Sequence, residues 1–156
     1  MPRMPFHSLV FPYRFANNGQ IKFAIFKRTE ATGGFWQAIS GGGEDDETPM
    51  ETARRECFEE AGIPEDSPLI ALDSMATIPV EFIFGYLMWG DDVLVVTDHS
   101  FGVHVQDHAI ALSDEHTEFR WVSYQSAWEL LKWDSNKNAL WELNFRLLRA
   151  EQGKGI

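Results

Sequence analysis

The segment from Gly41 to Ile63, GGGEDDETPMETARRECFEEAGI, limits most strongly how this 156-residue chain can fold. Its glycine run is followed, over residues 48–61, by a stretch that has no glycine and has its one proline at the second position, which a helix start tolerates. Gly62 then stands where a helix C-terminal cap is expected. A narrow apolar stripe repeats every fourth residue and consists of Ala53, Cys57 and Ala61. The segment therefore predicts a loop followed by a helix that packs on a sheet.

Strand-like segments, rich in aromatic and alternating apolar residues, lie on both sides of this helix. They span residues 7–15, 21–29, 35–40, 69–72, 76–80, 82–88, 101–112 and 119–122. The glycines at 41–43 are predicted to stop the third strand. Two final helices are predicted over residues 123–133 and 135–150, the second capped by Asp134 or Ser135 and using its aromatic stripe as core. This order predicts one α+β domain over residues 1–156.

The charge of the chain excludes several classes of partner. Its 24 acidic and 13 basic residues give a net charge of −11, which disfavours long nucleic acids and anionic membrane surfaces. The single cysteine, Cys57, forms neither an intramolecular disulfide nor a cysteine-based zinc site. Because we find no signal peptide and no apolar run of membrane length, we expect a soluble cytoplasmic protein without membrane contact.

The acidic residues are concentrated in the segment 41–63, which holds eight acidic and two basic residues, a net charge of −6. On a helix, Glu56, Glu59 and Glu60 are spaced so that their carboxylates project from one face, where they repel one another. A divalent cation such as Mg²⁺ or Mn²⁺, which prefers hard oxygen ligands, accounts for that arrangement. A solvated acidic helix face is the alternative. The position of Arg55, four residues before Glu59 and eight after Glu47, favours the cation site.

The same segment resembles the Nudix box, GX5EX7REUXEEXGU, in which U is a bulky aliphatic residue. Gly41, Glu47, the pair at 55–56, the pair at 59–60 and Gly62 occupy the fixed positions. The first aliphatic position is the exception, because it holds Cys57. The resemblance implies a Nudix fold, a mixed β-sheet sandwiched between α-helices, and an enzyme that hydrolyses a pyrophosphate bond with Mg²⁺ or Mn²⁺.

The resemblance also assigns roles within the box. Metal ligands by position are Glu56, Glu59 and Glu60, with the carbonyl of Gly41. Arg55 and Glu47 correspond to the ion pair that holds the loop to the helix. A carboxylate must take the proton of the attacking water, and Glu56 and Glu59 are the two candidates for this base.

Short motifs outside the box resemble the bacterial dihydroneopterin triphosphate pyrophosphatases. They lie at residues 35–41, 80–84, 115–116 and 135–139, whereas residues 85–100 depart from that subfamily. By this resemblance Glu115 completes the metal site, with a surface loop acid as the alternative. The candidate substrate-binding residues are Arg28, Trp36, Gln37 and Phe82. Arg28 fits a phosphate or a strand-end surface position equally well, and core packing is favoured over ring stacking for Trp36 and Phe82.

The expected substrate is therefore a small nucleoside or pterin triphosphate, such as dihydroneopterin triphosphate or a nucleoside triphosphate. Alternatives are a dinucleoside polyphosphate or nucleotide-sugar hydrolase, an isomerase, and a Nudix module that binds a nucleotide without cleaving it. The complete set of box carboxylates argues against the last of these. The resemblance also allows a homodimer.

Overall fold

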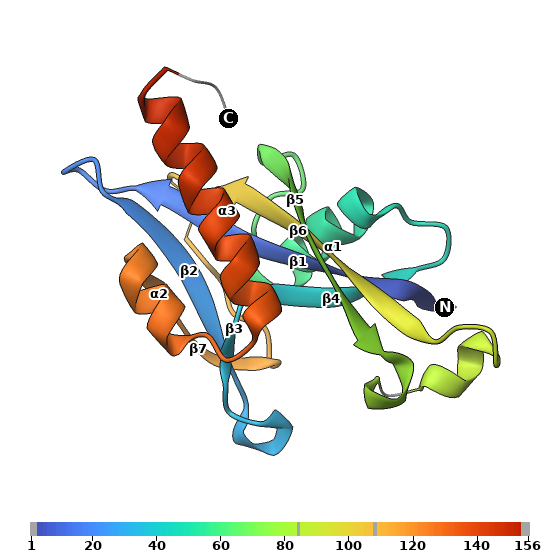
Figure 1. The fold of residues 1–156 in the computed structure, drawn as a ribbon. Coiled ribbons are helices and arrows are strands. Elements are labelled where there is room, and N and C mark those ends of the chain that lie inside the picture. The colour runs from blue at the N-terminus through green and yellow to red at the C-terminus, as the bar shows by residue number, and fades with distance from the viewer. Residues whose placement is uncertain (1–2, 84, 108, 154–156) are drawn as a thin grey trace.

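The computed structural model describes residues 3–83, 85–107 and 109–153. Its strands are β1 (Arg3–Phe15), β2 (Ile21–Arg28), β3 (Trp36–Gln37), β4 (Ile39–Glu44), β5 (Leu69–Pro79), β6 (Val95–His104) and β7 (His116–Val122). Its α-helices are α1 (Pro49–Ala61), α2 (Tyr124–Leu130) and α3 (Asp134–Glu151), and short 3₁₀ helices are η1 (Glu30–Thr32), η2 (Val80–Phe82) and η3 (Tyr86–Trp89). Figure 1 shows their arrangement.

The strands form one mixed sheet in the order β3-β2-β1-β6-β5, with β4 paired to β1 and β7 paired to β2. Strand β1 pairs in parallel with β6, whereas its pairings with β2 and β4 are antiparallel. It pairs with β4 through residues 3–10 and with β2 through residues 13–15. The glycine-rich strand β4 is thereby held beside the first half of β1 and next to α1. This position brings the predicted box into contact with the sheet.

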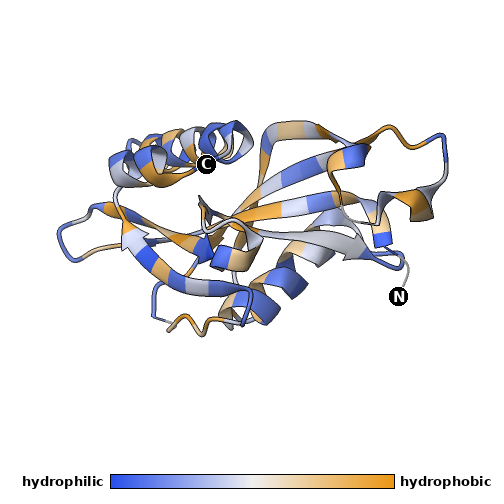
Figure 2. Ribbon diagram, turned by 90° about the horizontal axis from the view of Figure 1, so that it is seen from below, coloured by the Kyte–Doolittle hydropathy of each residue, from blue (hydrophilic) through white to orange (hydrophobic). Residues whose placement is uncertain are grey.

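Helices cover both faces of the sheet, as the resemblance implied. Figure 2 views the molecule at right angles to Figure 1 and places α1 and α3 on opposite faces. A core cluster on the α3 face contains Leu9, Phe11, Phe23, Ile25, Leu140 and Leu143, and one on the α1 face contains Val10, Phe26, Ile39, Ala53, Cys57 and Phe101. The alternation of β1 and β2 side chains between these clusters follows from the two-residue period of a strand. Among the described residues, no helix is long and apolar enough to cross a bilayer.

Helix α1 begins and ends as its sequence predicts. The Thr48 side chain accepts a hydrogen bond from the Glu51 N–H, and the Glu51 side chain accepts one from the Thr48 N–H, which forms a capping box. Gly62 closes the helix with a φ of 67°, a left-handed conformation that favours glycine. The predicted stripe of Ala53, Cys57 and Ala61 is buried.

The prediction that Gly41–Gly43 stops the third strand is wrong, because these glycines lie inside β4. A Cβ atom at Gly41 would collide with the carboxyl group of Glu56, and one at Gly43 would collide with the ring of Phe6. The glycines therefore allow side chains to pack closely over a strand. The sequence of this segment alone could not show these contacts, because the contacting side chains come from another strand and from α1.

Four further predictions about secondary structure are wrong. The described part of 82–88 contains parts of η2 and η3 instead of a strand, with Phe84 outside the described residues, and β6 ends at His104, short of the predicted residue 112. The N-terminal cap of α3 is Trp133, which makes no side-chain capping bond. Segments 69–72 and 76–80, predicted separately, are joined in β5 up to Pro79.

The aromatic residues of α3 do not all belong to the core. Leu140, Leu143 and Leu147 are buried as expected, but Trp141 and Phe145 are about half exposed and stack on each other with ring centroids 5.2 Å apart. The helix carries apolar side chains on both sides, and the sheet covers only one of them. The prediction that this stripe is core is therefore wrong for Trp141 and Phe145, the part that the alternative of a dimer interface would use.

Glu142 joins α3 to an irregularity in β5, where the pairing register shifts between Ala71 and Met75. Its carboxylate accepts hydrogen bonds from the backbone N–H groups of Asp73 and Ser74, each at 2.7 Å, and from Ser74 Oγ at 2.6 Å. Arg146 Nε donates to the same carboxylate at 2.8 Å. Burial opposes ionisation of Glu142, but these hydrogen bonds outweigh it and lower its pKa.

We expect Glu142→Gln to lower the free energy of unfolding by about 1–3 kcal/mol near neutral pH, because hydrogen bonds to a charged acceptor are lost. The pKa of Glu142 is lower in the folded than in the unfolded protein. Its contribution to the free energy of unfolding is therefore present above the unfolded pKa and is lost as the pH falls through the folded pKa. The difference from wild type should therefore shrink on acidification. Urea unfolding at several pH values measures it, with the exposed Glu151→Gln as control. A difference independent of pH would contradict the charged role.

Candidate active site

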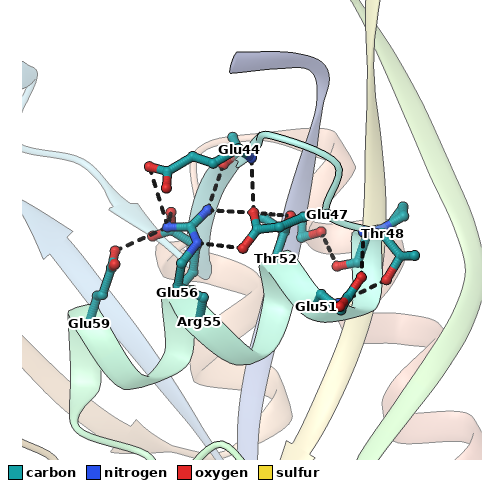
Figure 3. A network of polar contacts seen from close by, with 11 residues as sticks. Glu44, Glu47, Thr48, Glu51, Thr52, Arg55, Glu56 and Glu59 are labelled. Carbon is teal, nitrogen blue, oxygen red and sulfur yellow. Dashed lines mark hydrogen bonds and ion pairs between the residues drawn. The ribbon is translucent and has the colours of Figure 1, made fainter. Parts of the chain in front are cut away.

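Arg55, on α1, is the centre of a network of carboxylates (Figure 3). Its guanidinium donates to both oxygens of Glu47, with distances of 2.8 and 3.0 Å, to Glu56 Oε1 at 2.9 Å and to Glu59 Oε2 at 3.1 Å. It also donates to the carbonyl of Gly42 at 2.9 Å. The planar, forked geometry of a guanidinium suits such multiple contacts. Arg55 thus joins the loop before α1, strand β4 and the helix itself.

Glu47 is the main partner of Arg55, as the resemblance implied. Its Oε1 also accepts hydrogen bonds from the Glu44 N–H and from Thr52 Oγ1, both at 2.9 Å. Hydrogen bonding to Arg55 is the main cause that lowers the pKa of Glu47 to about 2. The same hydrogen bond raises the pKa of Arg55 above its ordinary value. The pair is therefore fully ionised near neutral pH.

Glu56 and Glu60 lie on the side of α1 that faces the sheet, whereas Glu59 points outward. Glu60 is 2% exposed and Glu56 is 9% exposed, while the Glu59 side chain is 54% exposed. The three carboxylates therefore differ in burial, although Arg55 Nη1 contacts both Glu56 and Glu59. The positions of Glu56 and Glu60, one turn apart, place both beside β4, and Glu59 joins them through its contact with Arg55.

Burial strongly shifts the two inner carboxyls. It raises the pKa of Glu56 to about 7, against an opposing effect of Arg55, and Glu59 and Glu115 raise it further. Burial, together with the neighbouring carboxyls of Glu115 and Glu56, raises the pKa of Glu60 to about 10. The interaction with Glu60, aided by Arg28, lowers the pKa of Glu115. Glu115, 55 residues later in the sequence, thus lies close to the two box carboxyls.

The residues present fit a divalent cation. Neither carboxyl oxygen of Glu60 has a hydrogen-bond partner among the described residues, although both are buried. A buried carboxyl without a partner is costly unless a ligand compensates it. In the described parts of the chain, no three acidic, histidine or cysteine side chains are arranged so that together they could hold a metal ion. The uncompensated oxygens of Glu60 and the nearby Glu56 and Glu115 nevertheless offer the hard donors that Mg²⁺ and Mn²⁺ prefer.

Two cavities that share lining residues lie in this region, and the smaller of them reaches Glu56 and Glu115. The smaller, of about 320 Å³, is lined by Arg3, His7, Arg28, Gln37, Ser40, Gly41, Gly42, Glu56, Phe82, Ile83 and Glu115. The larger cavity has a volume of about 740 Å³ and shares six of these residues. It extends along the face of the sheet that α3 covers, where Asp98, Trp133 and Asn136 also line it. Of the predicted substrate-binding residues, Arg28, Gln37 and Phe82 line both cavities.

Trp36 and Phe82 differ in their surroundings. Trp36 is buried in the core cluster on the α3 face, with the Arg120 guanidinium 4.7 Å from its ring centroid. Core packing, the alternative favoured for Trp36, matches this position. Phe82 is 72% exposed in η2, so the same preference for core packing is wrong there. Its ring is available at the mouth of both cavities, since the end of β5 turns away from the sheet at Pro79.

His116, the first residue of β7, follows Glu115 and has no role predicted from the sequence. His116 is buried, and its Nε2 lies 3.3 Å from Gln37 Nε2. Burial, with a smaller effect of Arg28, lowers its pKa to about 4. The imidazole is therefore neutral near neutral pH and adds no charge beside the acidic cluster. The short motif at 115–116 was the available signal, but only the register of β7 on β2 shows that the ring is buried.

Comparison with known proteins assigns the family. The NUDIX domain family matches residues 7–142, most of the chain. The chain belongs to the NUDIX family. This confirms the predicted Nudix fold and the predicted class of enzyme, a pyrophosphohydrolase. Divalent metal ions are the general cofactors of Nudix hydrolases, in agreement with the donors around Glu60.

Individual relatives of this Nudix protein agree with that assignment. It is 34% identical over 118 residues to a dihydroneopterin triphosphate diphosphatase of Haemophilus influenzae, with 74% of each chain covered. A candidate NUDIX hydrolase from Listeria monocytogenes has a solved structure with 41% identity and a TM-score of 0.83, covering 95% of this chain and 97% of its own. The E. coli dihydroneopterin triphosphate pyrophosphohydrolase has 25% identity and a TM-score of 0.70, covering 91% and 97%.

Proposed function

We propose that this Nudix enzyme hydrolyses a pyrophosphate bond in a small pterin or nucleoside triphosphate, with dihydroneopterin triphosphate as the preferred substrate and Mg²⁺ or Mn²⁺ as cofactor. The observation that carries the proposal is that the two cavities share six lining residues and so lie side by side. The smaller reaches the box carboxyls, and the larger has the apolar walls that a ring system needs. The named activity of the Haemophilus influenzae relative supports the choice of substrate.

The residues that would hold the cation are Glu56, Glu59, Glu60 and Glu115, with the Gly41 carbonyl. When bound, a divalent cation neutralises phosphate charge and lowers the pKa of an attacking water. The protein fixes these donors by two means. Arg55 orients the carboxylates of Glu56 and Glu59, and the absence of a side chain at Gly41 leaves room for Glu56 against β4.

Protein groups also act directly on the substrate in this proposal. Arg28, which lines both cavities, is placed to donate to a phosphate where they meet. The ring of Phe82 covers the mouth of the cavities and offers a stacking surface. Glu56 and Glu59 are the candidates for the base that takes the proton of the attacking water. Both contact the Arg55 guanidinium, which holds their carboxylates in place.

A substrate panel tests the proposal. Dihydroneopterin triphosphate, GTP, ATP, a diadenosine polyphosphate and a nucleotide sugar are each incubated with the protein and Mg²⁺ or Mn²⁺, and the products are identified by chromatography and phosphate assay. We expect pyrophosphate and a monophosphate from dihydroneopterin triphosphate, with kcat/KM at least about tenfold above that for ATP. Hydrolysis confined to the diadenosine polyphosphate or nucleotide sugar would overturn the substrate assignment. Tight binding with no turnover of any compound would overturn the reaction.

A further inference from the structure

Asp98 is a buried carboxylate of the larger cavity to which neither the sequence motifs nor the proposed reaction gives a role. It lies in β6, 6% exposed, between His7 of β1 and Ala76 of β5. It lines the larger cavity, under the α3 face of the sheet, but not the smaller cavity that reaches Glu56 and Glu115. Asp98 is therefore positioned to meet the part of a substrate that lies away from the phosphates.

The Asp98 carboxylate is not satisfied by the protein. Its Oδ1 is buried without a hydrogen-bond partner among the described residues. The nearest ionisable group is His7, whose Nδ1 is 3.4 Å from that oxygen, and His7 lines both cavities as well. Burying a carboxylate with an incomplete set of partners costs stability. The contact with His7 leaves acceptor capacity on Asp98 that a ligand with N–H donors would fill.

The cavity around Asp98 fits a flat ring. Apolar side chains from Leu9, Ile78, Phe82 and Trp133 line it, and its volume of about 740 Å³ is within the range of small-molecule sites. The polar side chain of Asn136 is already used, because its Oδ1 accepts the N–H of Ala38 at 2.8 Å. Asp98 is thus an acceptor with capacity beyond its contact with His7, beside apolar walls on which a ring can stack.

The geometry of the Asp98 carboxylate determines which ring it can bind through two hydrogen bonds. Its two oxygens lie in one plane and accept two parallel N–H donors, as they do from a guanidinium. A 2-amino-4-oxopyrimidine ring, present in pterins and in guanine, offers that pair through its ring N–H and its neighbouring amino group. Adenine and cytosine place an acceptor nitrogen beside their amino group and would leave one oxygen unpaired. We propose that Asp98 recognises the 2-amino-4-oxopyrimidine edge of the substrate in the larger cavity. This inference deepens the proposed function and rests on it for the direction in which the triphosphate lies.

Binding without hydrolysis tests the inference. Neopterin, which carries this edge and no phosphate, is titrated into the metal-free protein in EDTA and followed by its fluorescence; guanosine and adenosine are then used to displace it. We expect guanosine to bind at least about tenfold more tightly than adenosine. Asp98→Asn should weaken neopterin binding about tenfold and remove the preference for guanosine, because the amide offers one acceptor in place of two. Asp91→Asn, in an exposed turn, is the matched control.

Two variants separate recognition from a structural role. If Asp98 served only to pair with His7, then His7→Gln and Asp98→Asn would lower the melting temperature alike and leave the preference for guanosine intact. That result, or a wild-type protein that binds adenosine as well as guanosine, would overturn the inference. These experiments measure binding and not hydrolysis. A failure of the proposed reaction in the substrate panel therefore does not affect the test of Asp98, and a failure of the Asp98 test does not affect the substrate panel.

Discussion

Glu60→Gln is expected to lower kcat/KM by about 10³-fold while leaving the metal-free protein at least as stable as wild type. The glutamine keeps the shape of the side chain but removes an ionisable oxygen from the proposed cation site. Near neutral pH and without metal, the Glu60 carboxyl is protonated, since its pKa is raised to about 10. A neutral amide therefore replaces a neutral acid, and the fold loses little.

The same substitution should change how stability depends on pH. The pKa of Glu60 in the folded protein is raised from the ordinary value of 4.5 to about 10. The protonated Glu60 carboxyl therefore contributes fully to the free energy of unfolding below pH 4.5, and this contribution is lost as the pH rises towards about 10. Thermal unfolding of the wild type in EDTA should therefore show a decline over this range that Glu60→Gln reduces. Mg²⁺, which favours the ionised form, should raise the wild-type melting temperature more than that of the variant.

Glu65→Gln, an exposed change just beyond α1, is the control for these measurements. Activity of Glu60→Gln within about tenfold of wild type would exclude Glu60 as a ligand that the reaction needs. A large fall in the melting temperature of the metal-free variant would show instead that the carboxyl supports the fold. Kinetics and unfolding are measured on the same samples, so the two explanations can be told apart.

Local signals explain why so much of the box could be predicted. The proline at the helix start, the capping Gly62, the apolar stripe of α1 and the helical spacing of the glutamates lie within one short segment, so their geometry follows from the helix alone. The pairing of Arg55 with Glu47 also follows from adjacent turns and a short loop. Helical spacing alone could not show that Glu59 is exposed while Glu60 is buried, because the sheet that covers one side of α1 is formed by distant strands.

The substrate side of the site depends on contacts between distant segments. Asp98 becomes buried in a cavity only through the parallel pairing of β6 with β1 and the antiparallel pairing with β5. Phe82 reaches the cavity mouth because β5 ends at Pro79 and continues as η2, where alternation of apolar residues favoured a strand. Register and cavity shape are properties of the assembled sheet, and a reading of single segments cannot supply them.

Arg55→Ala is expected to lower the free energy of unfolding by about 3 kcal/mol and to abolish most of the activity. Arg55 is 17% exposed and is the shared partner of Glu47, Glu56 and Glu59. Its removal leaves these carboxylates to repel one another around β4 and the start of α1. Arg55→Lys should recover only part of the loss, because an ammonium group cannot reproduce the forked contacts.

Urea unfolding in EDTA and in Mg²⁺ measures this effect, with Arg54→Ala as the control for loss of a neighbouring arginine. Arg54 donates to the carbonyls of Glu65 and Ser67, both at 2.8 Å, and makes none of the carboxylate contacts shown in Figure 3. Mg²⁺ should raise the stability of Arg54→Ala as it does that of the wild type, and that of Arg55→Ala by less, because Arg55 orients Glu56 and Glu59 in the proposed cation site. Equal losses for the two variants, with equal gains from Mg²⁺, would show that Arg55 contributes packing alone and does not hold the carboxylates in place.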